Sequence, residues 1–301
     1  MDRIKASLRE RRASCRRGEA ATRPAHGPME TSPRLYSRPR WPFAPDPMAF
    51  SLKNFLKRHS ANPVTRRKAW NKYFERRLER HGLHIYKGHL NWALSPELAA
   101  LHERWGDTPG IPADRCCFLY NLARQVAARG IPGDTAECGV RFGKSSFFIM
   151  SGLGDPVRPH HVFDSFSGLS EAGEADVAMD GVKSWSAGDI AADERVCREK
   201  LAAFEQCNFY RGWIPERFPE IEDRRFALVH IDVDLLEPTR DALEFFWPRL
   251  EAGGVIVSDD YGFATCPGVT RAFDEFFAER PEKPLPIPTG QVLVWKDRPG
   301  A

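Results

Sequence analysis

Two apolar, strand-like segments of this chain each end in a pair of aspartates. The first pair is Asp232 and Asp234, and the second is Asp259 and Asp260. Buried strands rarely carry carboxylates at their ends, and four of them at one edge of a sheet would repel each other unless a cation or bound protons held them. Carboxylate oxygens are the ligands that hard divalent cations prefer. The pattern therefore predicts a divalent-cation site.

Such a site suits a reaction in which a hydroxyl group attacks an electrophile. A water-like hydroxyl has a pKa near ~15.7, far above the ~4 of a carboxylate, so a carboxylate alone is too weak a base. A cation on the oxygen lowers that pKa, and a carboxylate can then take the proton. We expect Asp232, Asp259 and Asp260 to bind the metal. Asp234, on the same side of an extended strand as Asp232, is the candidate base; the alternative is that some of these acids cap helices.

A glycine-containing loop follows another strand-like segment and precedes a helix. Gly139 and Gly143 allow a tight turn and a close approach to a ligand. Arg141 stands where the dinucleotide-binding fingerprint has its middle glycine, which disfavours a pyrophosphate on this backbone. Asp164, at the end of the next strand-like segment, could bind both ribose hydroxyls of an adenosine ligand. The alternatives are a glycine turn without a ligand and an aspartate that caps a helix.

Helical and strand-like patterns alternate from about Leu94 onward. Ser95 and Pro96 mark a helix start. The alternation predicts an α/β fold of the Rossmann-like type, a mostly parallel sheet with helices on both faces, and ligands in such sheets bind at the carboxyl ends of the strands. Expected strands cover 135–138, 161–164, 207–211, 227–233, 254–258 and 291–296, and expected helices cover 95–104, 115–129, 144–150, 194–204, 239–250 and 268–277.

Composition divides the 301 residues into three segments. Residues 1–47 hold 11 Lys and Arg against 5 Asp and Glu and are expected to be a disordered basic arm. Residues 48–110 are expected to be a helical extension that serves as a lid or in oligomerisation, and 111–301 to be the catalytic domain. No apolar run approaches the ~20 residues of a membrane helix. The favoured interpretation of the first segment is an extension without a function that precedes a start at Met48. The alternatives are an organellar transit peptide and a basic arm that touches nucleic acid or lipid.

The partners and the compartment can also be estimated from composition. Outside the arm the chain is mildly acidic, which argues against nucleic acid as a partner. The seven cysteines include no Cys-x-x-Cys pair, a pattern typical of reduced thiols in a cytoplasmic protein.

Taken together, these segments resemble the macrocin-type (TylF/MycF) sugar O-methyltransferases. The resemblance runs from about Arg115 to Lys296. It is carried by Gly133–Ser145, Phe163–Ser170, His230–Leu235, Pro238–Leu250, Gly253–Gly262, Cys266–Glu275 and Pro288–Val294.

The resemblance implies a class I methyltransferase that uses S-adenosylmethionine (AdoMet) and Mg²⁺, acts on a hydroxyl of a sugar or glycosylated small molecule, and forms homo-oligomers. It assigns Asp232, Asp259 and Asp260 to the metal and Asp234 to the general base. The residues expected at AdoMet are Glu137, Cys138, Gly139, Val140, Gly143, Ser145, Asp164, Ser165, Phe166, Asp189, Gly212 and Trp213. Two alternatives stay open: an NAD-linked Rossmann oxidoreductase, and a non-catalytic AdoMet-binding protein of the same fold.

Overall fold

The computed structural model describes residues 95–177, 181 and 184–297. All of them belong to the second of two compact units of the chain, residues 86–301. The predicted arm 1–47 and most of the predicted segment 48–110 lie outside the described residues. The division of the chain into these segments therefore stays a prediction.

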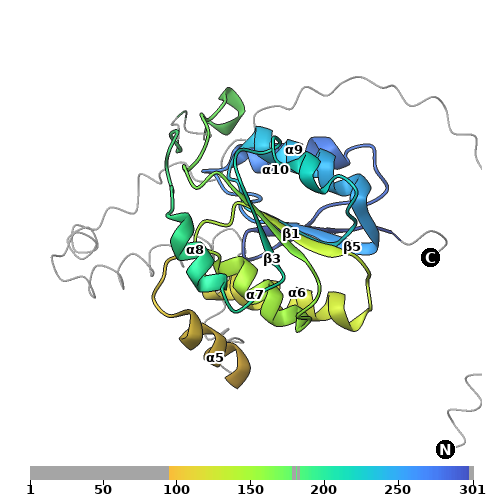
Figure 1. The fold of residues 1–301 in the computed structure, drawn as a ribbon. Coiled ribbons are helices and arrows are strands. Elements are labelled where there is room, and N and C mark those ends of the chain that lie inside the picture. Colours follow the sequence, from red (N-terminus) through yellow and green to blue (C-terminus); the bar gives the residue numbers. More distant parts are fainter. Residues whose placement is uncertain (1–94, 178–180, 182–183, 298–301) are drawn as a thin grey trace, which may run out of the picture. The chain divides into compact units, whose positions relative to one another are not determined.

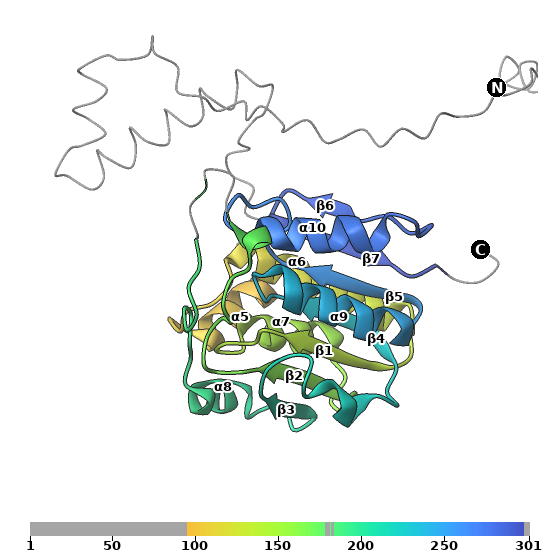
Figure 2. The same ribbon diagram turned by 90° about the horizontal axis from the view of Figure 1, so that it is seen from above.

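A seven-stranded sheet forms the centre of the described part of the chain, in the order β3-β2-β1-β4-β5-β7-β6 (Figure 2). Strands β1 to β5 run parallel, whereas β7 is antiparallel to β5 and β6 is antiparallel to β7. The prediction of a mostly parallel sheet is confirmed. The strands are β1 (Asp134–Cys138), β2 (His160–Asp164), β3 (Cys207–Arg211), β4 (Phe226–Ile231), β5 (Leu250–Ser258), β6 (Leu285–Ile287) and β7 (Gln291–Trp295).

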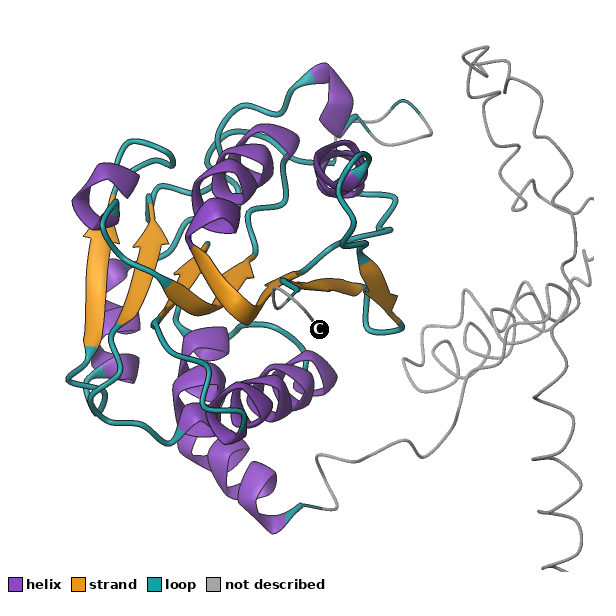
Figure 3. Cartoon of the chain, turned by 90° about the vertical axis from the view of Figure 1, so that its right-hand side faces the viewer, coloured by secondary structure: helices purple, strands orange, loops and turns teal. Residues whose placement is uncertain are grey.

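Helices cover both faces of the sheet (Figures 1 and 3). On one face α9 and α10 bury Phe246 and Phe273 against the sheet. On the other face α6 and α7 pack on Leu228 and Val257, and α5 and α8 join α7 in a neighbouring cluster. The helices are α5 (Pro96–Trp105), α6 (Ala113–Ala128), α7 (Lys144–Leu153), α8 (Glu194–Leu201), α9 (Leu236–Arg249) and α10 (Pro267–Phe277), with short 3₁₀ helices η2 (Glu174–Asp176) and η3 (Phe218–Ile221).

Most element boundaries agree with the sequence-based prediction, and the differences have local causes. Ser95 caps α5 as expected, because its hydroxyl accepts a hydrogen bond from the amide of Leu98 at 3.3 Å. Helix α9 begins at Leu236 rather than at residue 239, since Pro238 is tolerated in a first helical turn. Strand β5 begins at residue 250, four residues earlier than expected, and β6 was not predicted.

The strand order places a topological switch point between β1 and β4. From β1 the chain continues outward through β2 and β3 and then returns to the other side of β1 as β4. At such a point the connections diverge and leave a crevice outside the carboxyl ends of the strands, which is where ligands bind in open α/β sheets. The loops that carry the predicted site residues all leave the sheet at this edge.

Two further expectations concern the surroundings of the chain. Within the described residues, no helix is both long and apolar enough to cross a membrane. The six cysteines in the described part of the chain have free thiols, and four of them are buried. The cytoplasmic location stays a prediction.

Candidate active site

A cavity of about 450 Å³ lies against the loops that follow β1, β2, β3 and β4. Of the residues expected to bind AdoMet, those that line it are Gly139, Val140, Ser145, Asp164, Ser165, Gly212 and Trp213. Those that do not line it are Glu137, Cys138, Gly143, Phe166 and Asp189. Cys138 and Phe166 are buried in the core, Gly143 is the N-cap of α7, and the exposed Asp189 accepts a hydrogen bond from the amide of Ser186.

Gly139 is the point of closest approach between the loop after β1 and the end of β4. Its φ angle is +83°, and a Cβ atom there would lie 1.8 Å from the carbonyl oxygen of Asp232. Any side chain would therefore push the two loops apart. We call residues 137–145 together with Asp164 the glycine-loop edge of the cavity.

Asp164 is held by two backbone amides, one from this edge and one from the loop that follows β2. Its carboxylate oxygens accept hydrogen bonds from the amide of Arg141 at 2.7 Å and the amide of Phe166 at 2.6 Å. Both donors have positive φ angles, +50° and +55°, which is a costly conformation for such residues and one that concentrates at functional sites. Burial raises the pKa of Asp164 even though these hydrogen bonds favour the carboxylate. The side chain lines the cavity, as a ribose ligand would require.

Glu137 faces away from the cavity into a buried polar network. Its carboxylate is fully buried and accepts hydrogen bonds from the hydroxyls of Ser145 and Ser146 and from Nδ1 of His230, the last at 2.9 Å. Ser146 continues the network to Nε2 of His160 at 2.9 Å. Three protein groups thus fix Glu137, and its predicted contact with AdoMet stays a prediction.

The four aspartates follow the carboxyl ends of β4 and β5, and we call them the acidic edge. Asp232 and Asp259 do not belong to the group of described residues whose ligand atoms lie close enough together to share one ion. The two strands are in register up to Ile231 and Ser258, and the amide of Asp259 bonds to the carbonyl of Ile231 at 3.0 Å. Asp232 and Asp259 therefore begin from neighbouring positions. Burial, and then the charges of Asp259, Asp260 and Asp234, raise the pKa of Asp232 well above its usual range.

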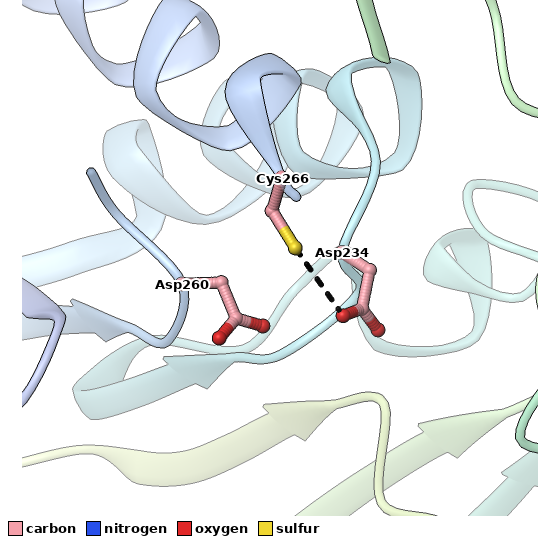
Figure 4. Close-up of side chains that lie close together, drawn as sticks. All are labelled: Asp234, Asp260 and Cys266. Atoms are coloured by element: carbon pink, nitrogen blue, oxygen red, sulfur yellow. Dashed lines mark hydrogen bonds between the residues drawn. The ribbon is translucent and has the colours of Figure 1, made fainter. Parts of the chain in front are cut away.

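Asp234 and Asp260 face each other beneath the thiol of Cys266 (Figure 4). Ligand atoms of these three residues all lie within 4.8 Å of one another, and the thiol lies 3.7 Å from Oδ1 of Asp234. Both aspartates have positive φ angles, +59° and +66°, which aspartate tolerates better than most residues. Burial and then the charge of Asp260 raise the pKa of Asp234 to about 7.

Asp259 is the most completely bonded of the four acids. Its Oδ1 accepts a hydrogen bond from the side-chain amide of Gln291 at 2.7 Å and lies 3.2 Å from Nε2 of His230. Its Oδ2 accepts a hydrogen bond from Nη1 of Arg115 at 2.8 Å. Burial opposes its ionisation, but His230 and then Arg115 outweigh burial and lower its pKa. His230 meets an acid at each ring nitrogen, and this pair raises its pKa against the effect of burial. His230 thus links the acidic edge to Glu137.

Sequence analysis did not identify Arg115, Gln291 and Cys266. One signal for Arg115 was present: it occupies the buried stripe of α6 together with Leu119 and Leu122, at helical spacing. A charge on an apolar stripe needs a buried partner of opposite charge, so the position of Arg115 indicates a buried acid elsewhere in the chain. Gln291 carries no comparable signal, because it is the first residue of a strand that otherwise looks like core.

The donor chemistry of both edges fits the two groups expected here. The acidic edge offers carboxylate oxygens, the ligands of a hard divalent cation, and burial, followed by the charges of Asp259, Asp260 and Asp234, raises the pKa of Asp232. The glycine-loop edge offers a fixed carboxylate, Asp164, and the half-buried Gly139, both of which line the same cavity. The arrangement can hold an adenosine ligand and a cation side by side.

Residues 109–290, more than half of the chain, match the family model described as macrocin-O-methyltransferase (TylF). One curated relative is the 8-demethyl-8-(2,3-dimethoxy-alpha-L-rhamnosyl)-tetracenomycin-C 4'-O-methyltransferase of Streptomyces olivaceus, 36% identical over 157 residues, which cover 49% of this chain and 60% of that protein. Another is the demethyldecarbamoylnovobiocin O-methyltransferase of Streptomyces niveus, 30% identical over 171 residues, or 54% of this chain and 64% of that protein. The chain thus spans less than two thirds of the length of these relatives.

Among solved structures, the O-methyltransferase NovP superposes with a TM-score of 0.54 at 25% sequence identity, covering 62% of this chain and 81% of NovP. The similarity confirms the predicted Rossmann-like methyltransferase fold.

Proposed function

This chain belongs to the macrocin-O-methyltransferase (TylF) family, and we propose that it transfers a methyl group from AdoMet to a hydroxyl oxygen with the help of Mg²⁺. Membership of this family argues against the NAD-linked oxidoreductase considered from the sequence. It also favours an enzyme over a binding protein of the same fold, because all four acids of the acidic edge are in place.

The proposed acceptor is a hydroxyl of a sugar or of a glycosylated small molecule. This class is supported by one relative, a methyltransferase whose named substrate carries a rhamnosyl group, and by the cavity itself. The cavity places two tryptophans, Trp185 and Trp213, near polar groups such as Asp234 and Glu237. Aromatic faces and hydrogen-bonding side chains together suit a ring that bears hydroxyl groups.

One observation supports the proposal most strongly: a single cavity is lined by Gly139 and Asp164 from one edge and by Asp232 and Asp234 from the other. Donor and acceptor can therefore meet without a large movement of the sheet. Proximity of this kind accounts for a large part of the rate enhancement in transfer between two substrates.

Each edge has a separate task in this proposal. When bound, AdoMet supplies the methyl group and the divalent cation lowers the pKa of the attacked hydroxyl. Asp164 would orient the ribose, and Asp232, Asp259 and Asp260 would hold the cation. Asp234 would accept the hydroxyl proton as the new carbon–oxygen bond forms.

The reaction can be tested by transfer of a tritiated methyl group from AdoMet to a panel of rhamnosides and other sugar glycosides. We expect counts in the acceptor with Mg²⁺ present and none in excess EDTA, with recovery on adding Mg²⁺ back. Full activity in EDTA would remove the metal from the proposal, and no transfer to any glycoside would remove the acceptor class.

Asp234→Asn tests the proposed base. Without a proton acceptor, turnover should fall by roughly 10²–10⁴-fold, whereas the Kd for AdoMet, measured by calorimetry, should stay within about twofold of wild type. Asp223→Asn is the matched control, since that carboxylate is 82% exposed, and it should retain full turnover. Near-normal turnover of Asp234→Asn would exclude Asp234 as the base.

Homo-oligomerisation stays a prediction from the family resemblance. Light scattering of the full-length chain measures it directly.

A further inference from the structure

Arg115 is the residue that meets the acidic edge most directly. From α6 its Nη1 donates to Oδ2 of Asp259 at 2.8 Å, and its Nη2 donates to Oδ1 of Asp260 at 3.1 Å. Its Nε donates to the carbonyl oxygen of Thr289 at 3.1 Å, and the guanidinium lies 5.1 Å from the ring centroid of Phe263. The whole residue is only 8% exposed. All three guanidinium nitrogens are therefore engaged.

Burial of this guanidinium has an electrostatic reason. Four carboxylates follow the ends of two neighbouring strands, and like charges this close together repel each other. Burial disfavours the charged form of Arg115, yet Asp259 and Asp260 raise its pKa. A buried charge of this kind is stable only with close, well-oriented partners, and the fork of an arginine can satisfy two carboxylates at once.

Arg115 also lies where the acidic pair meets the cavity. Asp232 and Asp234 line the cavity, whereas Asp259 and Asp260 do not. Arg115, bound to both members of the second pair, does line it. A cation that reached Asp259 and Asp260 from the cavity would therefore meet a positive guanidinium already seated on their oxygens.

We propose that Arg115 is the resident counter-cation of the acidic edge and competes with the divalent cation for the carboxylates of Asp259 and Asp260. Binding of the metal weakens or breaks the two ion pairs of Arg115. The proposal rests on the metal site of the proposed function. It explains how the edge stays folded without a metal, and it makes the affinity for the metal lower than four aspartates alone would give.

The principal test is the affinity for Mn²⁺ and Mg²⁺, measured by titration calorimetry on the full 301-residue chain after removal of metal. Arg115→Met keeps the apolar stem and removes the competing charge, so it should bind each ion at least about tenfold more tightly than wild type, the change that ~1.4 kcal/mol produces. Arg124→Met, an exposed arginine of the same helix that stacks on Tyr120, should leave the affinity unchanged.

Thermal unfolding gives a second readout that a merely structural role would not produce. In EDTA, Arg115→Met should melt well below wild type, because the four carboxylates lose a counter-charge. Saturating Mn²⁺ should close most of that gap, since the metal replaces the lost charge and stabilises the folded state in proportion to its affinity. A structural arginine would instead lower the melting temperature equally with and without metal, which would overturn the proposal.

The calorimetric outcomes separate this proposal from the one on which it rests. If neither wild type nor Arg115→Met binds a divalent cation, the proposed metal site is rejected, and the proposed competition with Arg115 is rejected with it. If both bind with equal affinity, or if the variant binds more weakly, the metal site stands and the role of Arg115 is overturned.

Two further measurements test the proposal if Arg115→Met fails to fold. Arg115→Lys retains a charge but lacks the two-pronged fork, so it should bind Mn²⁺ more tightly than wild type does. In wild-type protein labelled with ¹⁵N-arginine, the Nε–H signal of Arg115 should shift on titration with Mg²⁺. An unmoved signal under saturating Mg²⁺ would overturn the proposal.

Discussion

Asp164 at the glycine-loop edge and Asp259 at the acidic edge are held in place by opposite means. The carboxylate of Asp164 accepts hydrogen bonds from the neutral backbone amides of Arg141 and Phe166. At the acidic edge, the partners of Asp259 include two cationic side chains, Arg115 and His230. Neutral donors orient a carboxylate without cancelling its charge, whereas cations do both.

This difference indicates which edge is complete before anything binds. Asp164 has fixed geometry and open access to the cavity, so a ligand can add its own hydrogen bonds without displacing a protein group. The acidic edge has its charge balanced in part by Arg115, which a metal must replace or outcompete. The glycine-loop edge is therefore preorganised for its ligand. At the acidic edge, Arg115 takes the place of the metal until the metal binds.

Two histidines next to Glu137 show the same contrast. His160 is completely buried between Thr135 and Ser146, and burial lowers its pKa to about 4, so it is neutral. His230 contacts Glu137 and Asp259, and those acids raise its pKa. Glu137 therefore has neutral partners, Ser145 and Ser146, on one side and a charged partner, His230, on the other.

The largest effect on this comparison is expected from Gly139→Ala, because Gly139 joins the two edges. The new Cβ would overlap the carbonyl oxygen of Asp232 and force an alanine into a left-handed conformation. Overpacking and backbone strain together should lower the free energy of unfolding by about 3 kcal/mol or more, as measured by urea denaturation. Gly130→Ala has a similar φ of +60° but meets no atom within 4 Å, so it should lose only about 1–2 kcal/mol. Equal losses of stability in Gly139→Ala and Gly130→Ala would show that the backbone of Asp232 leaves room for a side chain at position 139.

A comparable but pH-dependent effect is expected from His160. In the unfolded chain its pKa is near ~6.5, above the folded value of about 4. As the pH falls between these values, only the unfolded chain takes up the proton, so the folded state loses up to about 3 kcal/mol. This stability is fully present above pH ~6.5. Chemical denaturation from pH 7 to 4 measures it.

His160→Gln serves as the matched variant, because its amide can still bond to Ser146 without titrating. Its stability should fall less steeply over the same pH range than that of wild type. An identical slope in both proteins would mean that His160 is not the neutral, buried group described above.

The smallest expected effect comes from the two tryptophans of the cavity. Trp213 follows β3 beside Asp164, whereas Trp185 donates to the thiol of Cys266 at 3.4 Å next to the acidic edge. Trp213→Ala should raise the Kd for AdoMet about fivefold, near the lower limit of ~1 kcal/mol for stacking on a base. Trp185→Ala should leave that Kd unchanged and raise the KM for the acceptor. The reverse result would mean that AdoMet binds beside Trp185 and the acceptor beside Trp213.

Sequence was sufficient to predict the fold because periodicity is a local signal. Parallel strands such as β4 read as continuous apolar runs, and Ser95 with Pro96 marks a helix start within a few residues. Strand β6 has three residues, one of them Pro286, and its side chains are largely exposed. A strand of that kind at the edge of a sheet has neither alternation nor an apolar run.

The candidate site was predictable only in part, for a related reason. Asp232 and Asp259 stand out because acids at the ends of apolar strands are unusual. The partners of these acids come from distant parts of the chain, and no local pattern pairs Arg115 with an acid 144 positions away. Glu137 illustrates the opposite difficulty: the sequence motif predicts a contact with a ligand but does not reveal that Ser145 and His230 bond to its carboxylate.

The hydrogen bond from Gln291 to Asp259 has a consequence for the synthesis of the protein. Arg115 leaves the ribosome early, yet it also bonds to Thr289, 174 positions later. A nascent chain that lacks β7 already has the four aspartates, but it lacks the side-chain amide of Gln291 that bonds to Asp259. Contacts of such long sequence separation form slowly and late, so this edge should be the last part of the domain to mature.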